Sequence, residues 1–356
     1  MTDSSSIDPS APVRAGETLP VEVLETYLRA HLPGTRGPLV VEQFPRGFSN
    51  LTYLLRLGER ELVLRRPPFG ANIKSAHDMA REYQILRALV DVYPKAPRPL
   101  LYSDDPAVLG VPFYVMARVP GVILRNQPPP GVALNPGLMR ALSTALVDTL
   151  VELHGVDHTA AGLGHLGRPE GYVTRQVSGW IGRYQNARTD DLPDMEAVAA
   201  WMVSQQPPSR GAALIHNDFK YDNLVLDPLD LTQVLAVLDW EMATIGDPLM
   251  DLGTTLAYWI QANDAPELQT LGLTSYPGNL TRREVVARYG ARSGRDVGDI
   301  LFYYVFGLFK VGVIGQQIYY RYRQGFTRDP RFAPLIQLIT ACGRQAVQAI
   351  RQGDIA

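Results

Sequence analysis

The chain changes pattern along its length, and that change limits the folds it can adopt. Residues 39–66 hold three short runs rich in β-branched or aromatic residues, separated by turn-like segments, which predicts antiparallel strands. Residues 74–92 show the helical spacing of apolar side chains, and residues 98–119 contain two further strand-like runs. We therefore expect a small antiparallel sheet with one main helix in this part of the chain.

Helical periodicity dominates beyond the prolines at 128–130, apart from three short strand-like pieces within residues 212–240. A strand-rich part followed by a helix-rich part indicates an α+β protein. The 356 residues exceed what one compact core usually fills, so two lobes or two domains are expected. The predicted boundaries are a disordered tail at 1–19, a first lobe at 20–119 and a second lobe at 120–356.

The overall charge and the cysteine content exclude several classes of protein. The formal net charge is -2 and the pI is about 6.3, without the basic excess of a nucleic-acid-binding protein. The single cysteine, Cys342, excludes an intramolecular disulfide and a cysteine-based metal cluster. Residues 1–20 lack the pattern of a signal peptide, and the apolar stretch at 300–315 is interrupted by Lys310 and too short to span a bilayer. We expect a cytoplasmic protein with a buried helix at 300–315 and with no nucleic-acid or membrane partner.

Residues 214–226 concentrate polar side chains between two apolar runs, in the sequence LIHNDFKYDNLVL. An aspartate such as Asp218, held in a fixed loop, can accept the proton of a hydroxyl nucleophile. Lys220 lies two residues further on and can neutralise developing negative charge, although a solvated surface charge is the plain alternative. Asn223 offers a neutral oxygen ligand for a divalent cation. The segment therefore has the composition of a catalytic loop.

A second acidic segment follows at the end of the strand-like run VLAVLDWE, which carries Asp239 and Glu241. Carboxylates there suit Mg²⁺, which prefers one or two carboxylates together with phosphate oxygens and water. The spacing from Asp218 to Asn223 equals that of the protein-kinase catalytic loop, where four residues separate the Asp and the Asn. Packing alone rarely produces this spacing at strand ends, which favours a functional role for Asp218, Asn223 and Asp239.

The two segments HNDFKYDN and LDWEMATIGDPLMDL give the chain a family resemblance. It is similar to the aminoglycoside phosphotransferase and choline kinase family, and within it to the phosphotransferase domains related to the N-terminal part of certain acyl-CoA dehydrogenase-like proteins. The resemblance extends from about residue 20 to the end of the chain. It implies a bilobal, protein-kinase-like α+β fold, with an antiparallel-sheet N-lobe that binds nucleotide and a mostly helical C-lobe for catalysis and substrate binding. It also implies ATP and Mg²⁺ as cofactors.

The family motif implies a role for each residue that matches it. Asp218 would be the catalytic base or the group that orients the substrate hydroxyl, and Lys220 would lie near the transferred phosphoryl group. Asn223 and Asp239 would hold Mg²⁺, while His216 would fix the loop as a structural partner.

Three further acidic residues follow the metal-binding position. Asp247 and Asp251 in GDPLMDL are interpreted as mainly structural, Asp247 as the cap of a helix that begins at Pro248. Two interpretations of Glu241 remain open: it lies beside the metal, or it is a surface carboxylate.

The resemblance also locates a nucleotide site in the first lobe. The segment GFSNLTY lies where a kinase folds a hairpin over the phosphates, although taken alone it is an ordinary hairpin. Arg65 stands where a kinase has its strand lysine; arginine binds phosphate well but with a different geometry. Glu82 on the next helix is expected to pair with Arg65, with a surface glutamate as the alternative, and the backbone near 116–118 is expected to contact adenine. The residues expected at the nucleotide are Gly47, Ser49, Asn50, Arg65, Glu82, Met116 and Arg118.

The expected function is ATP- and Mg²⁺-dependent transfer of the γ-phosphoryl group to a hydroxyl of a small molecule. A protein kinase would need a long activation segment, and only MATIG separates Glu241 from the next helix start. A non-catalytic nucleotide-binding pseudokinase or scaffold is the alternative, favoured only by Arg65. A hydroxyacyl-CoA or another metabolite is the expected acceptor, ahead of an aminoglycoside, because arginines such as Arg321 and Arg323 suit an anion; a solvated surface explains them equally well. No oligomeric state is predicted.

Overall fold

The computed structural model describes residues 8–45, 50–68 and 78–356. The chain forms two compact units: unit 1 consists of Met1–Ile123 and Leu224–Ala243, and unit 2 of Leu124–Asn223 and Thr244–Ala356. The chain therefore passes from one unit to the other three times. The boundaries predicted from the sequence treat 120–356 as one segment, whereas residues 224–243 are part of unit 1.

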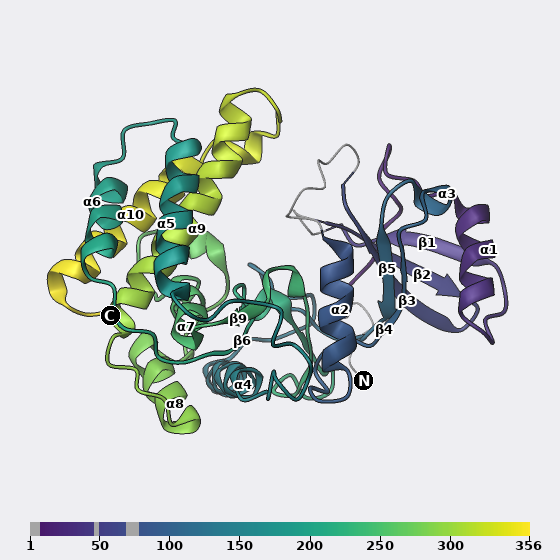
Figure 1. The fold of residues 1–356 in the computed structure, drawn as a ribbon, viewed down its shortest axis with the longest axis horizontal. Coiled ribbons are helices and arrows are strands. Elements are labelled where there is room, and N and C mark those ends of the chain that lie inside the picture. The colour runs from purple at the N-terminus through teal and green to yellow at the C-terminus, as the bar shows by residue number, and fades with distance from the viewer. Residues whose placement is uncertain (1–7, 46–49, 69–77) are drawn as a thin grey trace. The chain divides into compact units, whose positions relative to one another are not determined.

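Unit 1 is built on a five-stranded antiparallel sheet with the strand order β1-β2-β3-β5-β4 (Figure 1). Each of the three runs predicted within residues 39–66 forms one strand. The turn between β2 and β3 contains Gly58, whose φ is 64°. A Cβ at that position would lie 2.3 Å from the carbonyl oxygen of Arg36, so only glycine fits. The strands are β1 (Leu39–Gln43), β2 (Leu51–Leu57), β3 (Arg60–Arg66), β4 (Pro99–Ser103) and β5 (Phe113–Ala117).

The two faces of this sheet have different partners, because successive side chains of a strand point to opposite sides. One face packs through residues such as Tyr53 and Leu55 into an apolar core with α1 (Val21–His31). The other face carries Arg65 and is covered by α2 (Met79–Leu89), so that the helices lie on opposite sides of the sheet in Figure 1. The main helix predicted in this part of the chain is α2.

Smaller elements complete unit 1. A short helix, α3 (Pro106–Leu109), lies between β4 and β5. The returning segment adds an antiparallel pair, β7 (Leu224–Leu226) with β8 (Val234–Val237), followed by a 3-10 turn, η3 (Trp240–Met242). The end of β8 therefore delivers Asp239 to the unit that contains the sheet.

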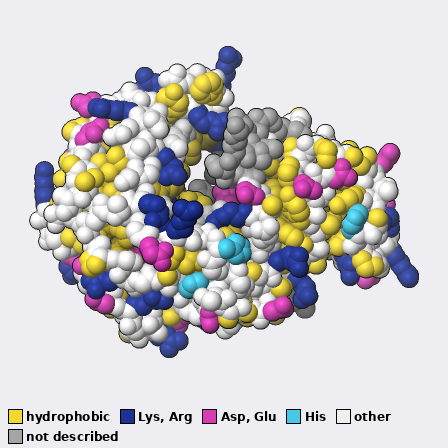
Figure 2. Space-filling view, viewed as in Figure 1, with side chains coloured by type: hydrophobic (Ala, Val, Ile, Leu, Met, Phe, Trp, Pro, Cys, Tyr) yellow, Lys and Arg dark blue, Asp and Glu magenta, His cyan; other side chains and the backbone are white. Residues whose placement is uncertain are grey.

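Unit 2 is mostly helical and contains one small antiparallel strand pair, β6 with β9. Its longest helix is α9, and on the face drawn in Figure 2 several Lys and Arg side chains gather where Figure 1 draws α5, α7 and α9. The elements are α4 (Pro136–His154), α5 (Tyr172–Asn186), α6 (Pro193–Ser204), β6 (Ala213–Ile215), η2 (Tyr221–Asn223), β9 (Thr244–Gly246), α7 (Pro248–Ala257), η4 (Leu268–Leu271), α8 (Arg282–Ser293), α9 (Ile300–Arg323), η5 (Pro330–Phe332) and α10 (Leu335–Gln352).

Helix α9 forms the core of unit 2. By length and composition it is apolar enough to cross a membrane, with a mean hydropathy of 1.3, but 78% of that window is buried inside the protein. It crosses α7 where Gly253 meets Gly307: a Cβ on Gly253 would lie 2.2 Å from the Tyr303 carbonyl oxygen. The two glycines allow the helix backbones to touch. The expectation of a buried helix at 300–315 is thus confirmed.

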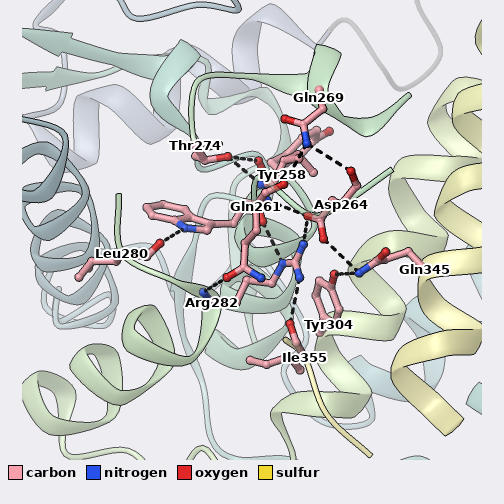
Figure 3. Close-up of polar contacts among 12 residues, drawn as sticks. Tyr258, Gln261, Asp264, Gln269, Thr274, Leu280, Arg282, Tyr304, Gln345 and Ile355 are labelled. Carbon is pink, nitrogen blue, oxygen red and sulfur yellow. Dashed lines mark hydrogen bonds and ion pairs between the residues drawn. The ribbon is translucent and has the colours of Figure 1, made fainter. Parts of the chain in front are cut away.

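Unit 2 contains a buried ion pair, in which the guanidinium of Arg282 bonds the carboxylate of Asp264 (Figure 3). Arg282 also donates to the carbonyl oxygens of Trp259 and Ile355, at 2.9 and 3.0 Å. Both side chains of the pair are almost inaccessible, so each charge depends on the other for compensation. The network ties the start of α8 to the C-terminal residues and, through Gln345, to α10.

Candidate active site

The predicted catalytic loop follows β6 and is attached to α7 by one carboxylate. Asp251 accepts the backbone N–H of His216 at 2.6 Å and that of Asn217 at 2.8 Å. The His154 side chain lies 3.1 Å from the same carboxylate. Burial alone would raise the pKa of Asp251, but the bond to His154 and the charges and amides around it lower it. Asp251 therefore stays ionised and holds the loop backbone in place.

The loop conformation is unusual at the residue before the proposed base. Asn217 has a φ of 67°, in the left-handed region that only Gly, Asn and Asp adopt readily. The next amide, that of Asp218, donates to Nδ1 of His216 at 3.3 Å. His216 is thus a buried structural partner of the loop, in agreement with its interpretation from the sequence.

Two predicted residues converge on the Asp218 carboxylate. Lys220 donates from Nζ to Oδ1 at 2.9 Å, and the Asn223 amide nitrogen donates to Oδ2 at 3.0 Å. The same Asn223 nitrogen reaches the Asp218 carbonyl oxygen at 2.8 Å. Because the nitrogen of the amide is used in this way, its oxygen is directed elsewhere and has no partner among the residues that the structure describes. The Asn223 oxygen is therefore suited to bind a cation.

Lys220 is held as a cation. Its Nζ lies 4.4 Å from the centre of the Tyr258 ring. Burial would lower the pKa of Lys220, but Tyr258 and the Asp218 carboxylate together raise it above its ordinary value. A permanent positive charge therefore sits beside the carboxylate proposed as the base, which agrees with a role in neutralising phosphate charge.

Unit 1 brings together three other predicted residues. Arg65 on β3 donates from Nη1 to Glu82 at 2.7 Å and from Nη2 to Asp239 at 2.8 Å. The expected pairing of Arg65 with Glu82 is therefore present. Burial would lower the pKa of Arg65, but the charge of Glu82 holds it well above its ordinary value. The two ends of one guanidinium thus bind a helix carboxylate and the proposed metal ligand at once.

Glu241, which the sequence leaves open, belongs to the same cluster. Its carboxylate accepts from the Asn50 side chain at 2.8 Å and lies 3.6 Å from Nη2 of Arg65. The Arg81 guanidinium donates to the Glu241 carbonyl oxygen at 3.1 Å. Arg81 was not singled out in the sequence; its position next to Glu82 on the same helix is the only signal. The Glu241 carboxylate is therefore held by Asn50 and Arg65 and is not a plain surface carboxylate.

The other residues predicted at the nucleotide lie in different surroundings. Met116 lies inside β5 and is buried, and the Arg118 side chain donates to Glu61 at 2.7 Å. The amide of Arg118 also donates to the Glu61 carbonyl oxygen, at 3.3 Å. Two predicted residues, Gly47 and Ser49, lie outside the described residues.

The start of α7 agrees with its interpretation from the sequence. Asp247 is the N-cap, its carboxylate accepts from the Leu249 amide at 2.9 Å, and Pro248 is the first helical residue. Asp251 lies one turn further on. Its structural role is thus a specific one, since it binds the catalytic loop itself.

A model of the phosphotransferase enzyme family matches residues 40–284. This chain belongs to that family. The mouse protein named acyl-CoA dehydrogenase family member 10 is 36% identical to it over 321 residues, which cover 87% of this chain and 29% of the relative. The chain therefore spans less than a third of that relative's length.

Solved structures of the phosphotransferase family have the same fold. A protein from Ralstonia eutropha assigned as an aminoglycoside phosphotransferase is 28% identical, with a TM-score of 0.78 over 93% of this chain and 99% of that one. Choline kinase from Cryptosporidium parvum matches 93% of this chain and 97% of its own, at a TM-score of 0.65 and 13% identity. An aminoglycoside phosphotransferase in ternary complex with ADP and hygromycin B has a TM-score of 0.58 at 15% identity, over 93% of this chain and 99% of its own. The predicted kinase-like α+β fold and the family resemblance are confirmed.

Proposed function

We propose that this phosphotransferase transfers the γ-phosphoryl group of ATP to a hydroxyl group of a small molecule. The observation that carries the proposal is the convergence of Lys220 and Asn223 on the Asp218 carboxylate. Loop residues so constrained, with a carboxylate at their centre, suit a reaction in which the protein mainly positions groups and neutralises charge.

Asp218 is proposed to accept the hydrogen bond of the acceptor hydroxyl. It would take the hydroxyl proton as the new P–O bond forms and the bond from the γ-phosphorus to the bridging oxygen of the leaving ADP breaks. Its carboxylate is 20% exposed, so it is reachable although its two oxygens already accept from Lys220 and Asn223. Each carboxylate oxygen has more than one acceptor site, so a further hydroxyl fits. Lys220 is proposed to balance the charge of the transferred phosphoryl group.

Mg²⁺ is proposed to be held by the amide oxygen of Asn223 and the carboxylate of Asp239. The donor set fits a hard cation that uses few protein ligands. When bound, the ion would neutralise charge on the phosphate oxygens. Asp239 has a φ of 67°, and one of its oxygens accepts from Arg65.

The nucleotide site is proposed to lie in unit 1, around Arg65 and Asn50. The ion pair of Arg65 with Glu82 corresponds to the phosphate-binding pair of kinases, with arginine in place of lysine. The ADP complex of a structural neighbour supports nucleotide binding. Contacts of Gly47, Ser49, Met116 and Arg118 with the nucleotide stay predictions, as does the cytoplasmic location.

A hydroxyacyl-CoA or another anionic metabolite is proposed as the acceptor, ahead of an aminoglycoside. The name of the mouse relative, an acyl-CoA dehydrogenase family member, supports an acyl-CoA link. The catalytic loop also lies beside two cations. One is Lys220, and the other is the ammonium of Lys310, which bonds the Asn217 carbonyl oxygen.

A second candidate function is a non-catalytic nucleotide-binding module. The ion pair of Arg65 with Asp239 favours it, because it engages the carboxylate that a metal would need. Asp218, Lys220 and Asn223 are nevertheless all present and mutually bonded, which a binding module does not require.

Release of ADP in the presence of a panel of hydroxylated metabolites tests the proposal. We expect a metabolite-dependent rate that needs Mg²⁺ and falls by about 10²- to 10⁴-fold in Asp218→Asn, since a positioned base contributes that much. Asp227→Asn, an aspartate in a turn outside the loop, is the matched control. Nucleotide-dependent thermal stabilisation without turnover for any metabolite, equal in both variants, would establish the binding module instead.

A further inference from the structure

Lysine is rare in this protein, and its use beside the catalytic loop is selective. Of 34 basic side chains only four are lysines: Lys74, Lys95, Lys220 and Lys310. Two of these four lie at the loop. A lysine ammonium is a compact point charge with three donors, whereas arginine is a broad planar fork. A chain that otherwise uses arginine therefore employs the compact cation at this place.

Lys310 is deeply buried in the middle of α9, with 2% of its surface exposed. Its Nζ donates to the carbonyl oxygen of Asn217 at 2.7 Å, directly before the proposed base. This is its one hydrogen bond among the residues that the structure describes. An ammonium has three donors, and a buried charge is costly unless its donors find acceptors. Two donors therefore have no acceptor among the residues that the structure describes.

The surroundings of Lys310 combine an aromatic ring with charges of both signs. Its Nζ lies 5.7 Å from the centre of the Trp180 ring, and the Arg183 guanidinium lies 4.7 Å from the same ring. Burial lowers the pKa of Lys310 to about 8, although Asp218 and Asp251 act in the opposite direction. No carboxylate forms an ion pair with Lys310 within the described ranges, so the charge is not neutralised by direct contact. Figure 2 shows Lys and Arg side chains gathered over this part of unit 2.

We propose that the ammonium of Lys310 binds a carboxyl-type oxygen, either a carboxylate or an acyl carbonyl, of the phosphate acceptor. The hydroxyl of the same molecule would then lie near Asp218, because Lys310 already bonds the peptide that precedes it. Lys310 thereby selects hydroxy acids and their acyl derivatives over neutral alcohols and over amines, which its charge repels. The inference rests on the proposed function only in taking the ligand to be the acceptor.

Nuclear magnetic resonance of lysine labelled with ¹³C at Cε tests the binding directly on the wild-type protein without nucleotide. The chain has only four lysines, so few signals are expected. The signal of Lys310 is assigned because it is lost in Lys310→Arg. The probes are β-hydroxybutyrate, γ-hydroxybutyrate, their methyl esters and the matching diols. We expect the acids or the esters to move the Lys310 signal to saturation while the diols do not. The signal of Lys95, which is partly buried in unit 1, is the internal control.

The titration distinguishes a carboxylate partner of Lys310 from an acyl carbonyl partner. A Lys310 signal that shifts with the acids alone identifies a carboxylate partner. A signal that shifts with both the acids and the esters identifies an acyl oxygen. A Lys310 signal that stays in place with every acid and ester, or that moves equally with the diols, overturns the inference.

Kinetics give a second measurement that a merely structural lysine would not reproduce. In Lys310→Met we expect KM for the reactive acid or ester to rise by about 10- to 100-fold, as for the loss of a hydrogen bond to a charged group. KM for the matching diol should rise far less than KM for the acid or ester, and Lys95→Met should behave as wild type. An equal loss of kcat for acid and diol would assign Lys310 to loop geometry alone and overturn the inference.

Failure of the inference and failure of the proposed function can be told apart. A Lys310 signal that responds to acids in a protein that never releases ADP would support the binding site and contradict the kinase. Release of ADP that is indifferent to Lys310→Met would do the reverse.

Discussion

The Asp251 carboxylate on α7 accepts the backbone amide of His216 at 2.6 Å. The same carboxylate accepts the Asn217 amide and faces His154. A single buried acid on α7 thus fixes the peptide units that carry the proposed base. Asp251 therefore determines the geometry of the loop without itself being proposed to contact the substrate.

Replacing this acid should damage both stability and activity. In Asp251→Ala the amides of His216 and Asn217 lose their acceptor, and we expect the free energy of unfolding to fall by about 3–5 kcal/mol, as for a broken buried network. Urea denaturation measures that change, and ADP release measures the accompanying loss of turnover. Asp191→Asn, an exposed aspartate of unit 2, should change neither quantity. Full activity in a destabilised Asp251→Ala would show that the loop keeps its shape without the carboxylate.

Arg65 is expected to be irreplaceable by lysine. Its guanidinium spans from Glu82 to Asp239 with two different nitrogens, which a single ammonium reaches less well. We expect Arg65→Lys to lower the free energy of unfolding by about 1–3 kcal/mol, the range for hydrogen bonds to charged groups. Arg65→Met should cost more, because two carboxylates lose their counter-ion. Chemical denaturation checks both. Wild-type stability in Arg65→Lys would mean that the fork geometry has no importance here.

The buried ammonium of Lys310 should make stability depend on pH. Its pKa in the folded protein is about 8, below the ordinary 10.5, so the unfolded chain binds more protons between these values. Stability therefore rises with pH across this window. The groups around Lys310 that carry charge are Asp218, Asp251, Lys220 and Arg183.

The difference between wild type and Lys310→Met isolates this dependence. We expect the unfolding free energy of wild type, measured relative to the variant, to increase from about pH 8 to about pH 10. Parallel pH profiles for the two proteins would contradict the depressed pKa.

The ion pair in Figure 3 should contribute to stability without affecting catalysis. Asp264→Ala leaves the Arg282 charge buried and unpaired, and we expect a loss of about 3–5 kcal/mol. Asp354→Ala is the matched control, since it removes the partner of the largely exposed Arg283 and should cost at most about 1 kcal/mol. Thermal and urea denaturation measure both. Equal costs for the two variants would refute the importance of burial, and KM and kcat should be unchanged in each.

The local pattern of the sequence predicts most of the elements. Strand-like runs within 39–66 become β1, β2 and β3, and the helical period of 74–92 becomes α2. The short strand β9 and the helix α3 were not predicted, because three or four residues carry too little periodicity. The return of 224–243 to unit 1 was not predicted either, since a contact between distant segments leaves no mark on local spacing.

By itself the sequence determined which groups of the loop lie together, because Asp218, Lys220 and Asn223 are neighbours in the chain and share one turn of backbone. It also determined the pairing partner of Arg65 through the resemblance to kinases. Only the tertiary structure decided what surrounds them: Asp251 and Lys310 reach the same loop from 34 and 93 residues away. Burial, hydrogen-bond partners and the depressed pKa of Lys310 arise from the packing of α7 and α9 against that loop. These properties depend on distances in space, and a linear pattern of residue types does not contain them.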